Sequence, residues 1–254
     1  MASSADIVCS DNPAALEVYP LGEAQRGLWF AQALDPANPV FNTGQVMEIC
    51  GVLDVERFTR AVGKVHAEAG SLSLRILDDN RQLVEPGAEP PLSIVDLSQE
   101  ADPATVARSD IRRDMETPLD LARQSPAFCR LYRLGANRFW WYARLHHVIA
   151  DGFATHLVLS RVAELYNRGA ADAGPALSPL DIALEQDRLY GRSPQYAEDR
   201  TFWTGALRDM SEVAGIKPGQ ALTAHSYHHE TQPVPEGLSK RLRDLSIALK
   251  TGWS

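Results

Sequence analysis

Residues 144–153 read RLHHVIADGF, and this stretch is the most informative part of the sequence for the fold. It closes RFWWYARL (138–145), a run of aromatic and aliphatic residues that is typical of a β-strand. Two adjacent histidines end the run, and an aspartate and a glycine follow four and five positions after the second histidine. A polar cluster of this kind is costly to bury unless each group has a partner. We therefore expect it either to be satisfied by packing or to be used for chemistry.

The residues on both sides of this polar turn predict regular structure. Upstream, AFCRLYRL (127–134) and the strand at 138–145 are joined by GAN, which indicates a β-hairpin. Downstream, apolar residues recur at helical spacing until Asn167–Gly169, where a helix is expected to stop. The residues of that stripe are Phe153, Leu157, Val158, Val162, Leu165 and Tyr166. The predicted order is strand, polar turn, helix.

The rest of the chain predicts further helices and short strands. Asp54 is expected to cap a helix from Val55 to about Ala69, which Gly70 stops. Further helices are predicted at 103–116, 180–190, 194–209 and 236–250. Strands are predicted at 46–52, 72–77, 82–85 and 92–96, with 226–234 as a further candidate. Loops are expected at 33–44 and 169–179.

Composition excludes several classes of function. The 254 residues are 44% hydrophobic and 23% charged, as expected of a globular protein, and the net charge of −8 argues against nucleic acid as a partner. Cys9, Cys50 and Cys129 form no CxxC pair, so we expect reduced thiols rather than a disulfide framework or a thiolate metal site. No basic, apolar leader and no membrane span is evident, so a cytoplasmic protein without membrane contact is expected.

The turn itself allows two interpretations. Asp151 is well placed to cap the following helix, and Gly152 lets another group approach the backbone closely. Adjacent side chains of a strand point to opposite faces, so only one of His146 and His147 can face a given cavity. A neutral imidazole there can accept a proton at cytosolic pH. The residues alone leave packing histidines and a catalytic pair both open.

Other chemistries find less support in the residues. Two histidines and a carboxylate can bind iron or zinc, but neighbours on a strand diverge and no third ligand at helical spacing follows. The chain has neither a GxSxG elbow nor a glycine-rich phosphate loop. His228–His229 repeats the dipeptide without the Asp–Gly and is expected to be solvated.

HHVIADG (146–152) fits the pattern HHxxxDG, and with its surroundings it resembles the condensation domains of nonribosomal peptide synthetases, in the chloramphenicol-acetyltransferase-like superfamily. The resemblance spans roughly residues 18 to 210, and the sequence around the histidines is most similar to that of siderophore-type synthetases. The other matching stretches are YPLGEAQRGLWFAQAL (19–34), VFNTG (40–44), METPLDLARQSPAFCRLYRL (115–134), SPLDIALEQDRLY (178–190) and YAEDRTFW (196–203).

The resemblance implies a mixed α/β (α+β) fold, with one sheet flanked by helices. Residues 1–17 are then expected to be a disordered or extended tail, 18–179 the N-terminal lobe, and 180–254 linker helices and the beginning of the C-terminal lobe. Family domains are nearly twice as long, so the resemblance implies a truncated domain whose second lobe is missing.

The resemblance also implies a reaction and its site. Two carrier-protein phosphopantetheine arms enter a tunnel, where an acceptor amine attacks a donor thioester and an amide forms. His147 then corresponds to the catalytic histidine, while His146 and Asp151 are structural, Asp151 through a salt bridge. The Gly152 amide corresponds to the group that binds the thioester oxygen. No metal or directly bound cofactor is implied, and the expected partners are carrier-protein domains and the remaining synthetase modules.

One departure from the family pattern concerns arginine. The family element HExLRTRF is replaced by AGSLSLRI (69–76), which places Ser73 where the first arginine belongs and keeps only Arg75. A buried Asp151 that depended on that arginine would lack it. Two further functions stay open: a non-catalytic remnant or carrier-docking module, and a stand-alone thioester-dependent acyltransferase.

Overall fold

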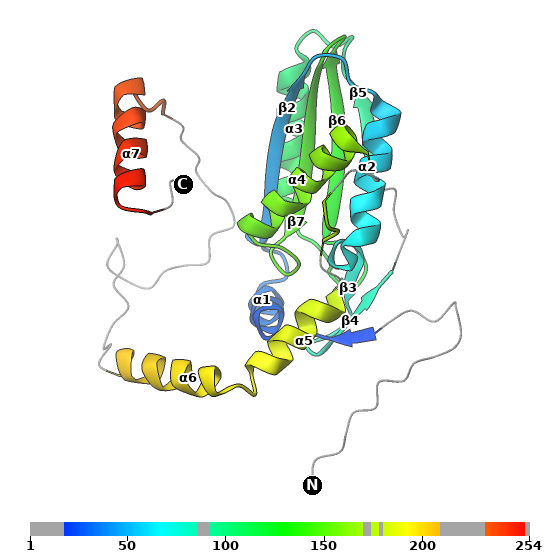
Figure 1. Cartoon of the computed structure of the whole chain (residues 1–254). Helices are drawn as coiled ribbons and strands as arrows, with labels where there is room; N and C mark the ends of the chain where they lie inside the picture. The colour runs from blue at the N-terminus through cyan, green and yellow to red at the C-terminus, as the bar shows by residue number, and fades with distance from the viewer. Residues whose placement is uncertain (1–17, 86–91, 170–173, 178–179, 209–231, 252–254) are drawn as a thin grey trace.

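The computed structural model in Figure 1 describes residues 18–85, 92–169, 174–177, 180–208 and 232–251. The expected tail at 1–17, Cys9, His228–His229 and residues 226–231 of the candidate strand lie outside these ranges. Residues 232–234 are described and belong to no strand, so the strand predicted at 226–234 is wrong for that part.

A mixed four-stranded sheet forms the centre of the fold, in the order β2-β7-β6-β5. Its strands are β2 (Asn42–Cys50), β7 (Arg138–His146), β6 (Ala127–Gly135) and β5 (Ser93–Asp96). β7 is antiparallel to both β2 and β6, and β5 is parallel to β6. The parallel pair needs a crossover connection, which contains α3 (Pro103–Met115). The predicted hairpin between 127 and 145 is confirmed.

Helices cover both faces of this sheet. α2 (Val55–Glu68) and α4 (Gly152–Arg168) lie on one face, and α3 lies on the other (Figure 1). β7 is consequently buried at every residue after Arg138. A strand covered on both sides carries a near-continuous hydrophobic run. This explains why RFWWYARL contains so little polar alternation.

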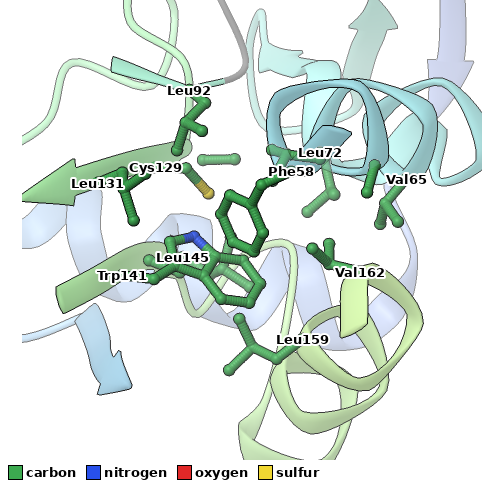
Figure 2. Packing of buried hydrophobic residues seen from close by; sticks show 14 of the residues in the cluster. Phe58, Val65, Leu72, Leu92, Cys129, Leu131, Trp141, Leu145, Leu159 and Val162 are labelled. Atoms are coloured by element: carbon green, nitrogen blue, oxygen red, sulfur yellow. The ribbon is translucent and has the colours of Figure 1, made fainter. Parts of the chain in front are cut away.

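Alternating residues of β7 enter two separate cores. Trp141 and Leu145 pack with Phe58, Val62 and other side chains of α2 and α4, as Figure 2 shows. Trp140 and Tyr142 face the α3 side instead. The strand thus positions its last residue, His146, between two well-packed layers.

A second, three-stranded sheet supports the end of β7. It has the order β1-β4-β3, with β1 (Val18–Pro20), β4 (Arg81–Val84) and β3 (Leu74–Ile76), and a 3₁₀ turn η1 (Gly70–Ser73) precedes β3. Leu21, Ile76 and Val148 share a third apolar cluster with Leu28 of α1 (Glu23–Leu34). The turn that follows the histidines is therefore anchored beside α1.

Three more helices follow: α5 (Leu180–Tyr190), α6 (Pro194–Ala206) and α7 (Glu236–Ala248). The Asp187 carboxylate accepts a hydrogen bond of 3.0 Å from the Glu23 amide, which joins α5 to the start of α1. α6 and α7 have no buried residue, and Phe202 of α6 is 64% exposed. None of the helices in the described ranges is long and apolar enough to cross a membrane.

The helix predictions for α2 to α5 agree with the structure to within two residues, and α6 ends earlier than predicted. The main corrections are at the first strands. β2 begins at Asn42, inside the predicted loop at 33–44, because pairing with β7 continues to Asn42–His146. The predicted strand at 72–77 begins instead as the 3₁₀ turn. The sequence pattern had assigned neither α1 nor β1.

Gly44 lies in the first part of β2, where the strand begins before its predicted start. A Cβ added at Gly44 would lie 2.7 Å from Sδ of Met115 and 3.0 Å from the ring of Tyr142. A side chain at this position would require the side chains of Met115 and Tyr142 to shift, so glycine favours the close approach of the end of α3 to β2.

Candidate active site

The candidate site is the turn between β7 and α4. The backbone amide of His146 donates to the carbonyl of Pro126 over 2.9 Å, and that of His147 donates to the carbonyl of Phe41 over 2.8 Å. The histidine pair is therefore held from one side by the segment before β6 and from the other by the segment before β2. This arrangement fixes the backbone of both residues.

His146 is sealed inside the protein, with 1% of its surface exposed. Its Nδ1 accepts a hydrogen bond of 3.1 Å from the amide of Val148, and its Nε2 lies 3.4 Å from Oε1 of Gln32. Because Nδ1 is an acceptor, the neutral ring carries its proton on Nε2. Both ring nitrogens are engaged within the protein, which makes His146 a structural residue of the turn.

Burial lowers the pKa of His146 from 6.5 to about 4, and the charges of His147 and Arg144 act in the same direction. The unfolded chain therefore binds a proton between pH 6.5 and 4 that the folded chain does not bind. The free energy of unfolding is unaffected by this group above pH 6.5 and falls as the pH drops toward 4, by about 2–4 kcal/mol in all.

We expect the substitution His146→Asn to flatten this pH dependence, since asparagine does not titrate there. Urea unfolding at pH 7, 6, 5 and 4.5 measures it. His66 is also partly buried and its pKa is lowered by burial, so only the difference between wild type and variant isolates His146. Parallel profiles for the two proteins would contradict the assigned burial cost.

His147 differs from its neighbour because it is partly exposed. The alternation of a strand allows only one of two adjacent side chains on each face. The structure buries His146 and leaves His147 partly exposed. Of the two histidines, His147 is the more exposed.

Asp151 caps α4 and is exposed. Its Oδ1 accepts a hydrogen bond of 2.8 Å from the Ala154 amide, while its carbonyl accepts from both the amide and the hydroxyl of Thr155. The expected salt bridge is not found: in the described ranges Asp151 forms no ion pair. Arg75, the retained family arginine, pairs with Glu85. An exposed carboxylate bound to a backbone amide needs no arginine.

Replacing Asp151 with alanine is expected to lower the free energy of unfolding by about 1 kcal/mol, the usual cost of losing an N-cap. Asp151→Asn keeps an oxygen at the same position and should stay within about 0.5 kcal/mol of wild type. Thermal and urea unfolding of the two variants measure the difference. An equal loss in both would point to an electrostatic role instead.

Gly152 is the first residue of α4. A Cβ added there would meet no heavy atom of the described residues within 4 Å. The fold of the described residues therefore does not require glycine at this position. The open space lies next to the first amide of a helix, where a polar atom of a ligand can be bound.

The structure also identifies site residues that the sequence pattern did not. Gln25 donates a hydrogen bond of 3.1 Å to the Val148 carbonyl, and Gln32 contacts His146. Asn42 donates to the carbonyls of Met115 and Thr117, which ties the start of β2 to the end of α3. The only signal for them is the family-like sequence AQRGLWFAQ (24–32) and FN (41–42). It does not indicate that these residues lie near the histidines.

Arg144 opens the quoted stretch but does not belong to the reacting groups. Its guanidinium donates a hydrogen bond of 2.8 Å to Asp114 of α3, whose other oxygen accepts from the hydroxyl of Tyr142 over 2.6 Å. Its side chain is 7% exposed. Arg144 therefore fastens α3 to the sheet.

An open pocket of about 570 Å³ lies beside the turn. It is lined by Trp29, Gln32, Ala33 and Pro36, by Ile76 and Leu77, and by residues of the segment 118–124. Neither histidine of the turn lines it. Gln32 is the residue that the pocket and the turn share.

The described residues contain no cluster of three or more histidines, cysteines or carboxylates that could hold a metal ion. Cys50 and Cys129 are free thiols in this part of the chain, and burial raises the pKa of Cys129 to about 12. Cys129 is therefore a packing residue rather than a nucleophile.

The mixed sheet and the HHxxxDG turn between its central strand and a capped helix define a lobe of the chloramphenicol-acetyltransferase-like fold. The family model "Condensation domain" matches residues 15–248. The dimodular nonribosomal peptide synthase of Bacillus subtilis is 34% identical over 242 residues, which cover 92% of this chain and 10% of that protein. Enterobactin synthase component F of Escherichia coli is 28% identical over 207 residues, which cover 78% of this chain and 16% of that protein.

Among solved structures, the first condensation domain of the calcium-dependent antibiotic synthetase matches with a TM-score of 0.79 and 27% identity. The match covers 95% of this chain and 59% of that domain. The chain thus spans little more than half of a solved condensation domain and a small part of the curated synthetases. It belongs to the condensation-domain family of the nonribosomal peptide synthetases.

Proposed function

We propose that this chain supplies the histidine-bearing lobe for amide-bond formation between two carrier-bound substrates. The amine of an acceptor aminoacyl thioester attacks the carbonyl carbon of a donor thioester, the C–S bond breaks, and the donor thiolate leaves. The proton of the amine passes to His147 and from there to the thiolate. The observation that carries this proposal is the partial exposure of His147 beside the sealed ring of His146.

One histidine that accepts a proton is sufficient for this reaction. A thiolate leaves readily and a neutral amine is already nucleophilic, so proximity and orientation supply most of the rate. A neutral imidazole that takes a proton contributes a further factor of about 10²–10⁴. The backbone hydrogen bond from the His147 amide to the Phe41 carbonyl fixes the backbone from which this imidazole extends.

Gly152 is proposed to bind the developing charge on the thioester oxygen. Its amide belongs to the first turn of α4, where backbone N–H groups lack partners within the helix and the helix dipole favours negative charge. In the part of the chain that the structure describes, no heavy atom lies within 4 Å of a Cβ added at Gly152, which leaves room for an acyl group.

The variant Gly152→Ala is expected to separate stability from turnover. Its free energy of unfolding should stay within about 0.5 kcal/mol of wild type, because the added methyl group meets no atom of the residues that the structure describes. Amide formation should fall about tenfold or more, since the methyl group occupies the space of the substrate. Gly205→Ala on α6, where a Cβ also meets no atom of the described residues, is the matched control and should leave the rate of amide formation unchanged. Full turnover in Gly152→Ala would remove Gly152 from the site.

Substrates are proposed to arrive on the phosphopantetheine arms of carrier proteins, which act as partners rather than as cofactors bound by this chain. The similarity to enterobactin synthase component F supports a siderophore-type assembly line. Cytoplasmic synthesis fits this proposal. The other modules of the synthetase would supply the activated acids.

Mass spectrometry of carrier-bound products tests the proposal. The chain, alone and extended by a second lobe, is mixed with donor-loaded and acceptor-loaded carrier proteins. A new amide on the acceptor carrier supports condensation. Carrier binding without product in both forms would favour a docking module, and acyl transfer to a free amine or alcohol would favour a stand-alone acyltransferase.

A further inference from the structure

Helix α1 holds the histidine turn from behind. Gln25 and Gln32 are seven residues apart, which is about two helical turns, so both side chains lie on one face of α1. Gln25 donates from Nε2 to the carbonyl of Val148, and Gln32 presents Oε1 to Nε2 of His146. Gln25 thus contacts the turn at Val148, and Gln32 contacts it at His146.

The orientation of the Gln32 side chain follows from its other contacts. The residue is 7% exposed, so its amide nitrogen needs partners within the protein. That nitrogen donates to the carbonyls of Asp35, Pro36 and Asn38 over 3.3, 3.4 and 3.1 Å. With the nitrogen engaged there, the oxygen faces the imidazole of His146.

The hydrogen-bond partners of His146 also determine which ring nitrogen carries the proton. The amide of Val148 can only donate, so Nδ1 must accept, and Nε2 then bears the hydrogen that Gln32 accepts. The imidazole is thus a bridge between α1 and the residue that follows His147. A change at Gln32 frees one end of this bridge.

We propose that Gln32 is a positioning residue for condensation, acting through the tautomer and orientation of the His146 ring. The inference rests on the proposed function, in which His147 is the reacting histidine. Val148 is bound by the His146 ring at its amide and by Gln25 at its carbonyl. His147 therefore lies between two residues whose positions α1 fixes.

A double-mutant cycle with Gln32→Met and His146→Asn tests this chain of contacts. Methionine matches glutamine in length but offers no amide oxygen, while asparagine keeps an acceptor near the position of Nδ1 and loses the contact to Gln32. Gln124→Met is the matched control, because Gln124 lines the same pocket but bonds to the Asp120 amide.

Two measurements on the 254-residue chain report the positioning without any substrate. Nitrogen NMR of the imidazoles should show the Nε2–H tautomer of His146 in wild type and a mixture in Gln32→Met. Hydrogen exchange of the Val148 amide should quicken about tenfold in Gln32→Met, the effect of one hydrogen bond. Gln124→Met should resemble wild type in both.

In a complete two-lobe domain, Gln32→Met should lower kcat about tenfold while KM for the acceptor substrate stays within about twofold, because the lost contact places a reacting group and binds no substrate. In the His146→Asn background, the same substitution should change kcat less than about twofold, since the two residues act as one unit.

An Nδ1–H tautomer in wild type would overturn the proposal, whatever the variants do. Unchanged tautomer and exchange in a folded Gln32→Met protein would overturn it as well, and so would additive effects in the cycle. If the complete wild-type domain formed no amide, the proposed function would fail, while the NMR and exchange results would still decide whether Gln32 positions the turn.

Discussion

Replacing His147 with alanine in a complete two-lobe domain is expected to lower the rate of amide formation by about 10²–10⁴-fold. The loss reflects the missing proton acceptor, and the remaining rate reflects proximity of amine and thioester. Single-turnover transfer between loaded carrier proteins, followed by mass spectrometry, measures it. Because the side chain is partly exposed, removing it should leave the free energy of unfolding within about 1 kcal/mol of wild type.

His156 provides the matched control for this experiment. It is an exposed histidine on α4, and its ring contacts Ser160 over 3.4 Å. His156→Ala should form amide at the wild-type rate. If His147→Ala did so too, the reacting histidine would have been assigned wrongly, and the docking interpretation would gain support.

Replacing Phe58 with alanine is expected to have the largest effect on stability, a loss of about 3–5 kcal/mol. The side chain is 3% exposed and meets the ring of Trp141 edge-on, with 5.0 Å between the ring centres (Figure 2). It extends from α2 against Trp141 of β7 and Tyr166 of α4, so its removal leaves a cavity in the core between these elements. Urea unfolding followed by tryptophan fluorescence measures the loss.

Two further variants calibrate this prediction. Phe58→Leu keeps most of the volume and should cost about 1–2 kcal/mol, while Phe202→Ala removes an exposed ring from α6 and should change stability by less than about 0.5 kcal/mol. A loss below about 1 kcal/mol in Phe58→Ala would show that this cluster does not support the sheet.

Much of the fold could be predicted because its signals are local. The N-cap residues Asp54 and Asp151 and the apolar stripes behind them mark α2 and α4 within a few residues of their bounds. The turn at 135–137 likewise marks the hairpin of β6 and β7. Where the structure departed from expectation, the cause was distant: β2 begins at Asn42 because it pairs with His146 across the sheet.

For the site, too, local features are predictable from the sequence and long-range contacts are not. Strand alternation predicts that one of the two histidines faces inward, but which one is sealed depends on residues distant in the sequence, among them Gln32, 114 positions away. Asp151 was expected to need an arginine, whereas it is exposed and bound to the amide of Ala154. Neither burial nor hydrogen-bond partners of this range can be derived from residue types and spacing alone.

The contacts between α1 and the histidine turn also determine when the site can form during synthesis. Gln32 and His146 are separated by 114 positions and Gln25 and Val148 by 123, so a ribosome produces the helix long before its partner. Until residue 148 has left the exit tunnel, the glutamines of α1 have nothing on the turn to bind. The geometry around His147 is therefore among the last features of this lobe to appear on a growing chain, after the local helices have formed.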